Sequence, residues 1–215
     1  MDEDRPRVLA RAQGVSGELV LREHEGRREV IAGGVFLMDT SDGRSERLLV
    51  SGAVRPGGHV LVGGLGVGSS LQEALDAGAA HVTLVELEPA LVGWHREGLL
   101  GAASAAALTD PRVELVVADV IDVLGERPGA YDAVCLDTDN GPDWLVRQEN
   151  GALYGDAGLA TALAALRPGG VLALWSAGPS PEFERRLRGL AGGVRREEVP
   201  VRRGEPDVVW FATAP

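Results

Sequence analysis

Short apolar runs alternate with amphipathic segments from residue 59 onward. The apolar runs have the length and composition of strands, and the segments between them have the apolar spacing and the glycine or proline boundaries of helices. Strands are predicted over residues 59–63, 82–86, 113–117, 131–136 and 171–175, and helices over residues 69–77, 90–100, 120–124, 156–166 and 181–190. Because strands and helices alternate, we expect a mostly parallel sheet with helices on both faces.

The chain closes with two apolar runs that no helix separates. They cover residues 194–201 and 208–212, with a turn-like segment at 203–206. Consecutive strands without a crossover pair as a hairpin, so the final strand should run antiparallel to the others. Dinucleotide dehydrogenases generally continue with parallel crossovers, whereas class I methyltransferase-like folds end in such a hairpin. The pattern therefore predicts a Rossmann-like methyltransferase sandwich, an α/β fold with a mostly parallel seven-stranded sheet and an antiparallel last strand.

The segment before residue 55 has a different pattern. Residues 1–17 are predicted to be irregular, and three alternating runs follow at 18–23, 28–32 and 35–38, separated by glycine turns. They predict a small antiparallel β-meander. A helix is expected over residues 45–54, with Leu48, Leu49 and Val54 facing inward. We therefore divide the chain into an N-terminal meander with a linking helix, residues 1–54, and a nucleoside-binding domain, residues 55–215.

Composition narrows the possible functions of this chain of 215 residues. Its net charge of −11 argues against nucleic acid as a partner, because binding phosphates requires a basic face. No apolar run approaches the ~20 residues of a membrane span, and no apolar signal core follows the acidic start, so we expect a cytoplasmic protein without a membrane partner. The chain contains no lysine, which excludes Schiff-base chemistry on a lysine side chain. Its single cysteine, Cys135, lies in an apolar run, and its four histidines lack metal-ligand spacing, so no metal site is predicted.

A glycine-rich turn follows the first strand of the larger domain. Gly64, Gly66 and Gly68 lie where strand changes to helix, with Leu65 between the first two. Glycine permits the tight turn and lets backbone N–H groups approach a ligand without a Cβ in the way. A dinucleotide fingerprint would place a further glycine or alanine at Ser69. The turn therefore predicts a nucleoside site, and it does not by itself identify the nucleoside.

Carboxylates end the next two strands. Glu86 lies about twenty residues after the turn, beside Leu87, where an acid can accept both ribose hydroxyl protons. For Glu88 we expect a role near the start of the following helix. Asp119 follows the third strand, where it can cap a helix or accept a hydrogen bond from an adenine amine while the backbone of Val120 contacts the ring.

The fourth strand ends in a polar loop. Asp137, Asp139 and Asn140 lie at the sheet edge where open α/β sheets bind ligands, so we expect them to contact the reacting end of the ligand. Asp137 is also expected to contact the nucleoside. The long loop that continues to Tyr154 has the composition of a lid or acceptor pocket.

Most of the chain resembles the spermidine synthase family of polyamine aminopropyltransferases, a branch of the class I methyltransferase-like fold. Segments similar to that family's motifs are residues 35–39, 61–73, 85–89, 131–137, 152–154 and 166–171. The resemblance implies a ligand of the S-adenosylmethionine type. Three features depart from the family pattern. Val67 stands where the family's glycine motif has an acid, and residues 45–50 stand where the family has its polyamine gate. Asn140 aligns with the family's catalytic acid, although Asp139 could take that role if the loop is shifted by one residue.

These departures led us to predict S-adenosylmethionine as the cofactor and methyl transfer to a small-molecule acceptor. Asp139 would orient or deprotonate the acceptor, with Asp137 and Asn140 as positioning residues. One alternative is aminopropyl transfer from decarboxylated S-adenosylmethionine, with Asp139 as general base. Another is a non-catalytic nucleoside-binding protein, whose cleft Trp144 or Tyr154 would block. The free edges of the meander favour a homodimer.

Overall fold

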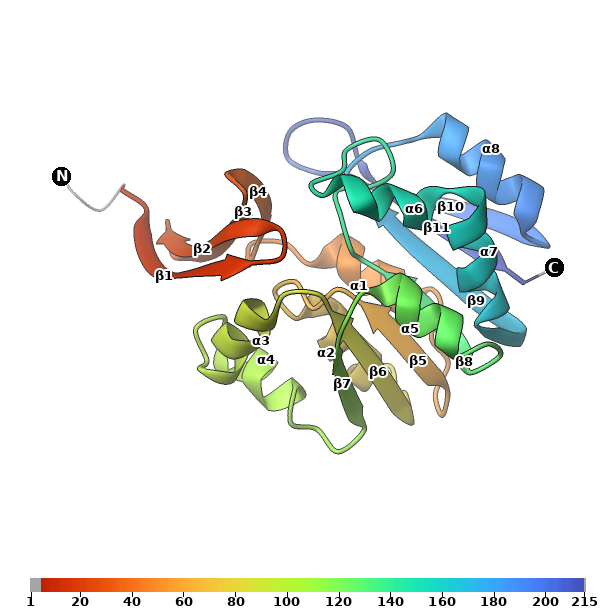
Figure 1. The fold of residues 1–215 in the computed structure, drawn as a ribbon, viewed down its shortest axis with the longest axis horizontal. Coiled ribbons are helices and arrows are strands. Elements are labelled where there is room, and N and C mark those ends of the chain that lie inside the picture. Colours follow the sequence, from red (N-terminus) through yellow and green to blue (C-terminus); the bar gives the residue numbers. More distant parts are fainter. Residues whose placement is uncertain (1–4, 215) are drawn as a thin grey trace.

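Alternating apolar residues build a central sheet with two buried faces. In the computed structural model, which describes residues 5–214, the sheet has seven strands in the order β10-β11-β9-β8-β5-β6-β7 (Figure 1). These are β5 (His59–Gly63), β6 (His81–Glu86), β7 (Val113–Val117), β8 (Tyr131–Leu136), β9 (Leu166–Ser176), β10 (Gly193–Val199) and β11 (Asp207–Thr213). Strands β5 to β9 are parallel, and β11 runs antiparallel to β9. The predicted sandwich with an antiparallel last strand is confirmed.

Two groups of helices cover the sheet because successive strand residues point to opposite faces. In β5, Val60 and Val62 belong to the core beneath one group, whereas Leu61 belongs to the core beneath the other. The first group is α1 (Arg44–Ser51), α2 (Ser69–Asp76), α3 (Pro89–Arg96) and α4 (Ala102–Ala107). The second group is α5 (Val120–Glu126), α6 (Gly151–Tyr154), α7 (Asp156–Ala164) and α8 (Pro181–Leu190), with the short 3-10 helix η1 (Gln148–Asn150) before α6. Over residues 5–214, none of the helices combines the length and the apolar character needed to cross a bilayer.

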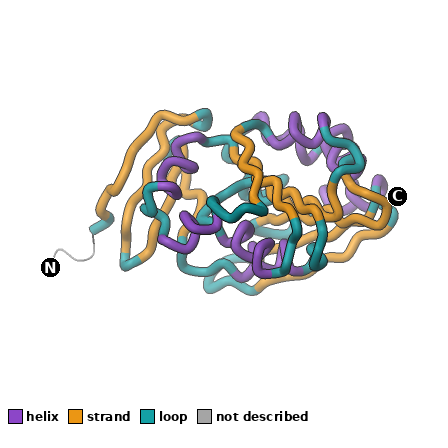
Figure 2. The backbone as a smooth tube through the Cα atoms, turned by 90° about the horizontal axis from the view of Figure 1, so that it is seen from below, coloured by secondary structure: helices purple, strands orange, loops and turns teal. Residues whose placement is uncertain are grey.

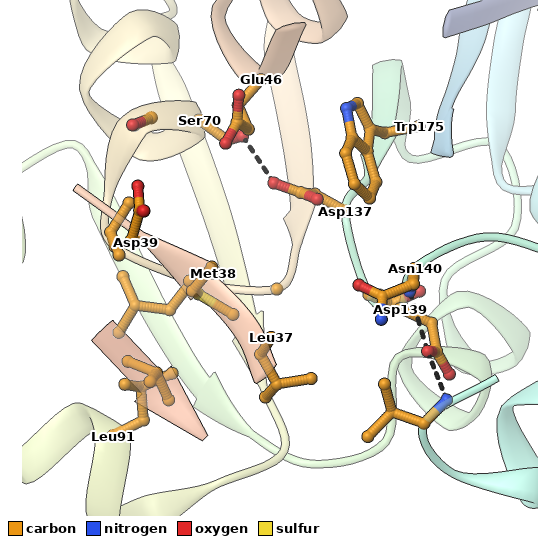
Figure 3. Close-up of a pocket in the computed structure, with 18 of the residues that line it drawn as sticks. Leu37, Met38, Asp39, Glu46, Ser70, Leu91, Asp137, Asp139, Asn140 and Trp175 are labelled. Carbon is orange, nitrogen blue, oxygen red and sulfur yellow. Dashed lines mark hydrogen bonds between the residues drawn. The ribbon is translucent and has the colours of Figure 1, made fainter. Parts of the chain in front are cut away.

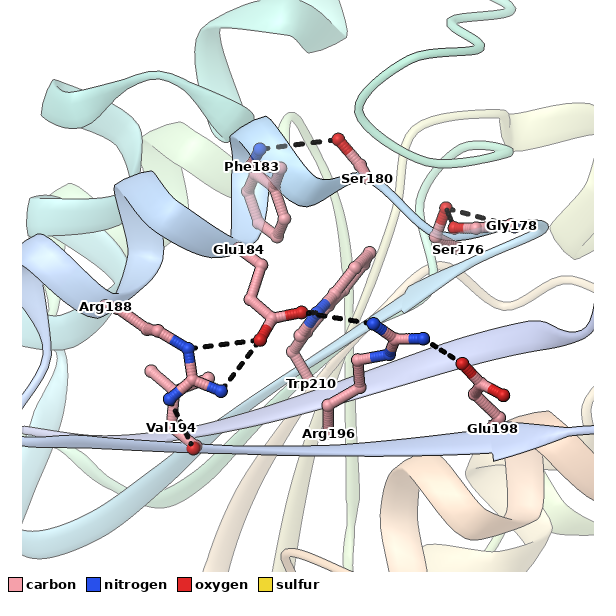
Figure 4. Close-up of polar contacts among 10 residues, drawn as sticks. All are labelled: Ser176, Gly178, Ser180, Phe183, Glu184, Arg188, Val194, Arg196, Glu198 and Trp210. Carbon is pink, nitrogen blue, oxygen red and sulfur yellow. Dashed lines mark hydrogen bonds and ion pairs between the residues drawn. The ribbon is translucent and has the colours of Figure 1, made fainter.

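A network of charges fixes the closing hairpin to α8. The carboxylate of Glu184 accepts hydrogen bonds from Trp210 Nε1 at 3.2 Å and from Arg188, and it pairs with Arg196 of β10 (Figure 4). Trp210 is fully buried and stacks edge-on against Phe183 of the same helix, with ring centroids 5.0 Å apart. The hairpin is therefore held by a buried aromatic pair whose polar group is satisfied.

A second, antiparallel sheet precedes this domain, with strand order β1-β2-β3-β4. Its strands are β1 (Arg7–Gly14), β2 (Gly17–His24), β3 (Arg27–Ala32) and β4 (Val35–Asp39). Figure 2 shows it as a separate layer at one end of the molecule. The prediction that residues 1–17 are irregular is wrong for β1, because none of that strand's residues is fully buried and its sequence carries little apolar alternation. Residues 1–4 lie outside the described part. The division at residue 54 and the homodimer stay predictions.

Glu88 joins the N-terminal sheet to the larger domain. Its two carboxylate oxygens accept hydrogen bonds from the backbone amides of Val15 at 2.9 Å and Ser16 at 2.7 Å, in the turn between β1 and β2. We expected Glu88 near the start of a helix. It does precede α3, but its side chain makes no capping hydrogen bond there and instead fixes the sheet. This contact holds the sheet over the carboxyl ends of the parallel strands.

We predict that Glu88→Ala loosens the N-terminal sheet. Two backbone amides lose a charged acceptor, which should cost about 1–3 kcal/mol of unfolding free energy. Urea unfolding and limited proteolysis within residues 14–17 measure the effect. Glu97→Ala, which removes an exposed acid just after α3, is the control and should leave both measurements unchanged. Equal cleavage rates in both variants would contradict the docking role.

Candidate active site

A large cavity lies where the chain reverses direction across the sheet. From β5 the chain runs through β6 to β7 on one side and then crosses to β8 on the other, so the carboxyl ends of β5 and β8 flank a topological switch point. The cavity has a volume of about 1120 Å³ and is lined by residues of both sheets and of the loop after β8 (Figure 3). The cavity lining includes ten of the predicted site residues: Gly64, Leu65, Gly66, Glu86, Leu87, Asp119, Val120, Asp137, Asp139 and Asn140.

The glycine turn packs directly against the end of β8. Gly64 has a φ of 93°, and a Cβ added there would lie 2.0 Å from the carbonyl oxygen of Asp137. Gly68 has a φ of 95° and directly precedes α2, outside the cavity lining. Only glycine accommodates both the dihedral angle and the close approach at Gly64. The turn is thereby fixed in register with the strand that carries Asp137.

A buried histidine supports the same turn and was not identified from the sequence. His95 of α3 places Nε2 at 2.8 Å from the carbonyl oxygen of Gly66 and Nδ1 at 2.7 Å from Ser104 Oγ. Burial lowers the pKa of His95, which favours the neutral ring that donates to Gly66 and accepts from Ser104. No sequence pattern links this histidine to the turn, because the contact depends on the packing of α3.

Glu86 lies beneath the turn as predicted, and its carboxylate is already anchored. One oxygen accepts from the backbone amide of Leu65 at 2.8 Å and the other from the amide of Glu88 at 2.8 Å. Burial raises the pKa of Glu86, and these backbone hydrogen bonds oppose the rise. Each oxygen retains a further lone pair, so the carboxylate can accept from a diol while its position is fixed.

Asp119 caps a helix. It accepts from the backbone amide of Ile121 at 3.0 Å at the start of α5, as one of its two predicted roles required. Its second oxygen lies 3.7 Å from Arg147 Nη1, which comes from the loop after β8. Recognition of adenine by Asp119 and Val120 stays a prediction, and Arg147 adds a cation beside it.

Asp137 and Asp139 have different surroundings although they are two residues apart. Asp137 accepts one side-chain hydrogen bond, from Ser70 Oγ at 3.3 Å. Burial raises the pKa of Asp137 to about 8, and the nearby charge of Glu46 adds to the rise. Asp139 accepts from the amides of Asn140 at 2.8 Å and Val146 at 2.7 Å, and from Asn150 Nδ2 at 2.8 Å. Asp139 therefore orders the loop, and Asp137 is the one of the two carboxylates that can still accept further hydrogen bonds in the cavity.

The other loop residues leave the cavity open. Trp144 is 57% exposed and does not line the cavity. Tyr154 is buried against Phe183 on the far side of the sheet, with ring centroids 5.6 Å apart. The blocked cleft expected for a non-catalytic protein is not observed. Asn140 is 7% exposed, and its Nδ2 has no hydrogen-bond partner within the described residues.

Acidic side chains dominate the cavity wall, and sequence motifs point to only some of them. Ten acidic and four arginine side chains line it among the described residues. The additional acids come from the N-terminal sheet, from α1 with the loop before it, and from the start of β11: Glu25, Asp39, Asp42, Glu46 and Asp207. No local motif connects these segments, so only the fold brings them together. Within residues 5–214, no cluster of three or more His, Cys, Asp or Glu side chains has the arrangement of a metal site.

The chain is similar in sequence to polyamine aminopropyltransferases. That of Mycobacterium tuberculosis is 31% identical over 179 residues, which cover 81% of this chain and 33% of that protein. Polyamine aminopropyltransferase 1 of Streptomyces coelicolor is 42% identical over 84 residues, or 38% of this chain and 16% of that protein. The chain thus spans about a third of the length of the curated relatives it matches over most of its residues. No model of a known protein family matches it.

Solved structures of spermidine synthases share the fold. A spermidine synthase in complex with the transition state analogue AdoDATO has a TM-score of 0.79 and 18% identity, over 97% of this chain and 74% of that one. Spermidine synthase from Thermotoga maritima has a TM-score of 0.77 and 18% identity, over 97% and 73% of the two chains. The chain is therefore similar in sequence to polyamine aminopropyltransferases and has the class I methyltransferase-like fold of spermidine synthases, as its motifs predicted.

These comparisons overturn the prediction of methyl transfer. The relatives are aminopropyltransferases and the similar structures are spermidine synthases, which favours the alternative. The prediction gave too much weight to Val67. Val67 packs against the apolar core and also lines the cavity, but carboxylates reach the cavity from other elements, through Glu46, Asp137 and Asp207.

We predict that Glu86→Ala weakens nucleoside binding by about 1–3 kcal/mol, because hydrogen bonds to a charged group are lost. Calorimetric titration with 5′-methylthioadenosine measures the change. Asp76→Ala, at the end of α2 and away from the cavity lining, is the control. Wild-type affinity in Glu86→Ala would remove the ribose assignment.

We also predict that Gly64→Ala destabilises the fold more than Gly98→Ala. Both glycines have a positive φ, 93° at Gly64 and 73° at Gly98, but an added Cβ meets nothing within 4 Å at Gly98. Both variants pay the dihedral cost of about 1–2 kcal/mol, and only Gly64→Ala adds a backbone clash. Urea unfolding of the two variants isolates the clash. Equal losses of stability would show that the turn and β8 can move apart freely.

Proposed function

We propose that this protein transfers an aminopropyl group from decarboxylated S-adenosylmethionine to an amine acceptor. The observation that carries this proposal is the acid-lined cavity at the switch point. An amine acceptor is a cation at neutral pH, and an excess of carboxylates attracts and holds cations. The relatives' shared activity supports the same conclusion.

The residues at the carboxyl ends of β5 and β6 suit the nucleoside. Glu86 would accept the ribose hydroxyls, and the turn at Gly64, Leu65 and Gly66 would let backbone approach the ligand. Asp119 and Val120 would contact the adenine. The bound sulfonium supplies an activated carbon next to sulfur, and the C–S bond breaks with its electron pair remaining on sulfur. The unsatisfied Nδ2 of Asn140 offers a hydrogen-bond donor at the reacting end.

Asp137 is proposed as the base. The acceptor nitrogen must lose a proton before its lone pair can attack carbon, and Asp137 has the raised pKa and free capacity that proton abstraction requires. Asp139 is assigned the ordering of the loop, because its carboxylate already accepts three hydrogen bonds. Alignment of the amine with the sulfonium carbon would supply much of the remaining rate enhancement.

The test is incubation of the protein with decarboxylated S-adenosylmethionine and putrescine, followed by mass spectrometry. We expect spermidine and 5′-methylthioadenosine in equal amounts. Asp137→Asn should reduce the rate by about 10²–10⁴-fold, the usual contribution of a general base. Asp143→Asn, an exposed acid of the same loop outside the cavity lining, is the control and should retain wild-type activity. Nucleoside binding without turnover on any amine would instead support a non-catalytic protein.

The pH dependence provides a separate check on Asp137. Only the ionised carboxylate accepts a proton, and the pKa of Asp137 is about 8. The value of kcat/KM for the acceptor should therefore rise by about tenfold per pH unit up to pH ~8 and then level off. A profile that is flat between pH 6 and 8 would exclude Asp137 as the base.

A further inference from the structure

A serine hydroxyl bridges two carboxyl groups at the back of the cavity. Ser45 Oγ lies 2.9 Å from Glu46 Oε2 and 2.7 Å from Asp207 Oδ2. Ser45 and Glu46 belong to the first turn of α1, and Asp207 opens β11, 162 positions away from Ser45 in the sequence. Ser45 is only 4% exposed, so water has little room to replace either contact.

The number of protons limits how these contacts can be made. A hydroxyl group has one proton, so Ser45 can donate to only one of the two carboxyl groups. The carboxyl group that does not receive this proton still lies 2.7–2.9 Å from Ser45 Oγ. That contact is favourable when the carboxyl group is protonated and donates its own proton to Ser45 Oγ. The geometry therefore fits a proton shared between Glu46 and Asp207.

The surrounding charges favour the same state. Asp42, in the loop before α1, faces both carboxyl groups, and Asp137 at the end of β8 lies close enough to interact with both. Glu86 of β6 adds negative charge near Asp137. Arg44 faces Asp207, but its guanidinium forms a bidentate pair with Asp42. Burial raises the pKa of both Glu46 and Asp207, and the shared hydroxyl offsets only part of that rise.

We propose that Glu46, Ser45 and Asp207 form a proton-sharing unit, which holds a proton in the free cavity and releases it when an acceptor ammonium group binds beside Asp137. The inference rests on the proposed function for the identity of the cation. The cation stabilises the ionised carboxylates, so the shared proton leaves to solvent and the negative charge of the cavity increases as the positive charge arrives. Ser45 and Asp207 are then positioning residues that make acceptor binding dependent on pH.

Proton release on binding tests the second half of the proposal. Putrescine is titrated calorimetrically into the protein saturated with 5′-methylthioadenosine, in buffers with different ionisation enthalpies at neutral pH. Wild type should release more protons than Asp207→Asn, by on the order of one proton per putrescine, because in this variant Ser45 donates to Glu46 alone. Glu97→Gln, which removes an exposed negative charge just after α3, should release as many protons as wild type. Equal release from wild type and Asp207→Asn would overturn the release step.

Infrared spectroscopy of the free protein tests the shared proton without any acceptor. Wild type at neutral pH should show a carboxylic acid C=O band that decreases in Asp207→Asn and in Ser45→Ala. Ser45→Thr retains the hydroxyl and should restore the band, which a purely structural role would not predict. An unchanged band in Asp207→Asn, with its circular dichroism spectrum like that of wild type, would overturn the proposal. If putrescine fails to bind while Asp207→Asn still loses the band, the proposed function fails and the shared proton stands.

Discussion

The close approach of the glycine turn to the end of β8 determines the geometry of the whole site. Because Gly64 leaves no space between its backbone and the carbonyl of Asp137, three strand ends converge on one small region. Glu86 then lies beneath the turn, and its hydrogen bond to Leu65 fixes the loop that would contact the nucleoside. A side chain larger than hydrogen at this position would separate the ribose carboxylate from the proposed base. The geometry of the proposed site thus depends on this backbone contact.

Placing many acids in one cavity costs folding free energy, and several different contacts offset parts of this cost. Several carboxylates in a partly buried space repel one another, and burial favours their neutral forms. Part of the cost is offset by backbone amides, as at Glu86 and Asp139, and burial raises the pKa of Glu46, Asp137 and Asp207, which favours their neutral forms. The carboxylates of such a cavity lack sufficient positive charge around them until a cation binds. The proposed preference for an amine acceptor would follow from this excess of carboxylates.

Much of the fold could be predicted from the sequence because buried strands leave a strong apolar signal. The seven-stranded sheet, the closing hairpin and the residues Gly64 and Glu86 were all identified in this way. The first strand was missed because none of its residues is fully buried, so burial constrains their polarity only weakly. The proximity of Glu46 and Asp207 could not be predicted from the sequence, because it arises from the packing of α1 against the last strands. The different surroundings of Asp137 and Asp139 depend on loop hydrogen bonds that no residue pattern encodes.

Glu86 and Glu88 lie on one short segment and hold two different turns. The first anchors the turn that would contact the nucleoside, and the second holds the β1–β2 turn of the N-terminal sheet. Their backbones are also connected, because Glu86 accepts a hydrogen bond from the amide of Glu88. Loss of the Glu88 contact would release the β1–β2 turn and would also loosen the backbone segment that positions the Glu86 carboxylate. Because side chains of the N-terminal sheet and of its turns also line the cavity, undocking of that sheet would open the cavity wall on this side.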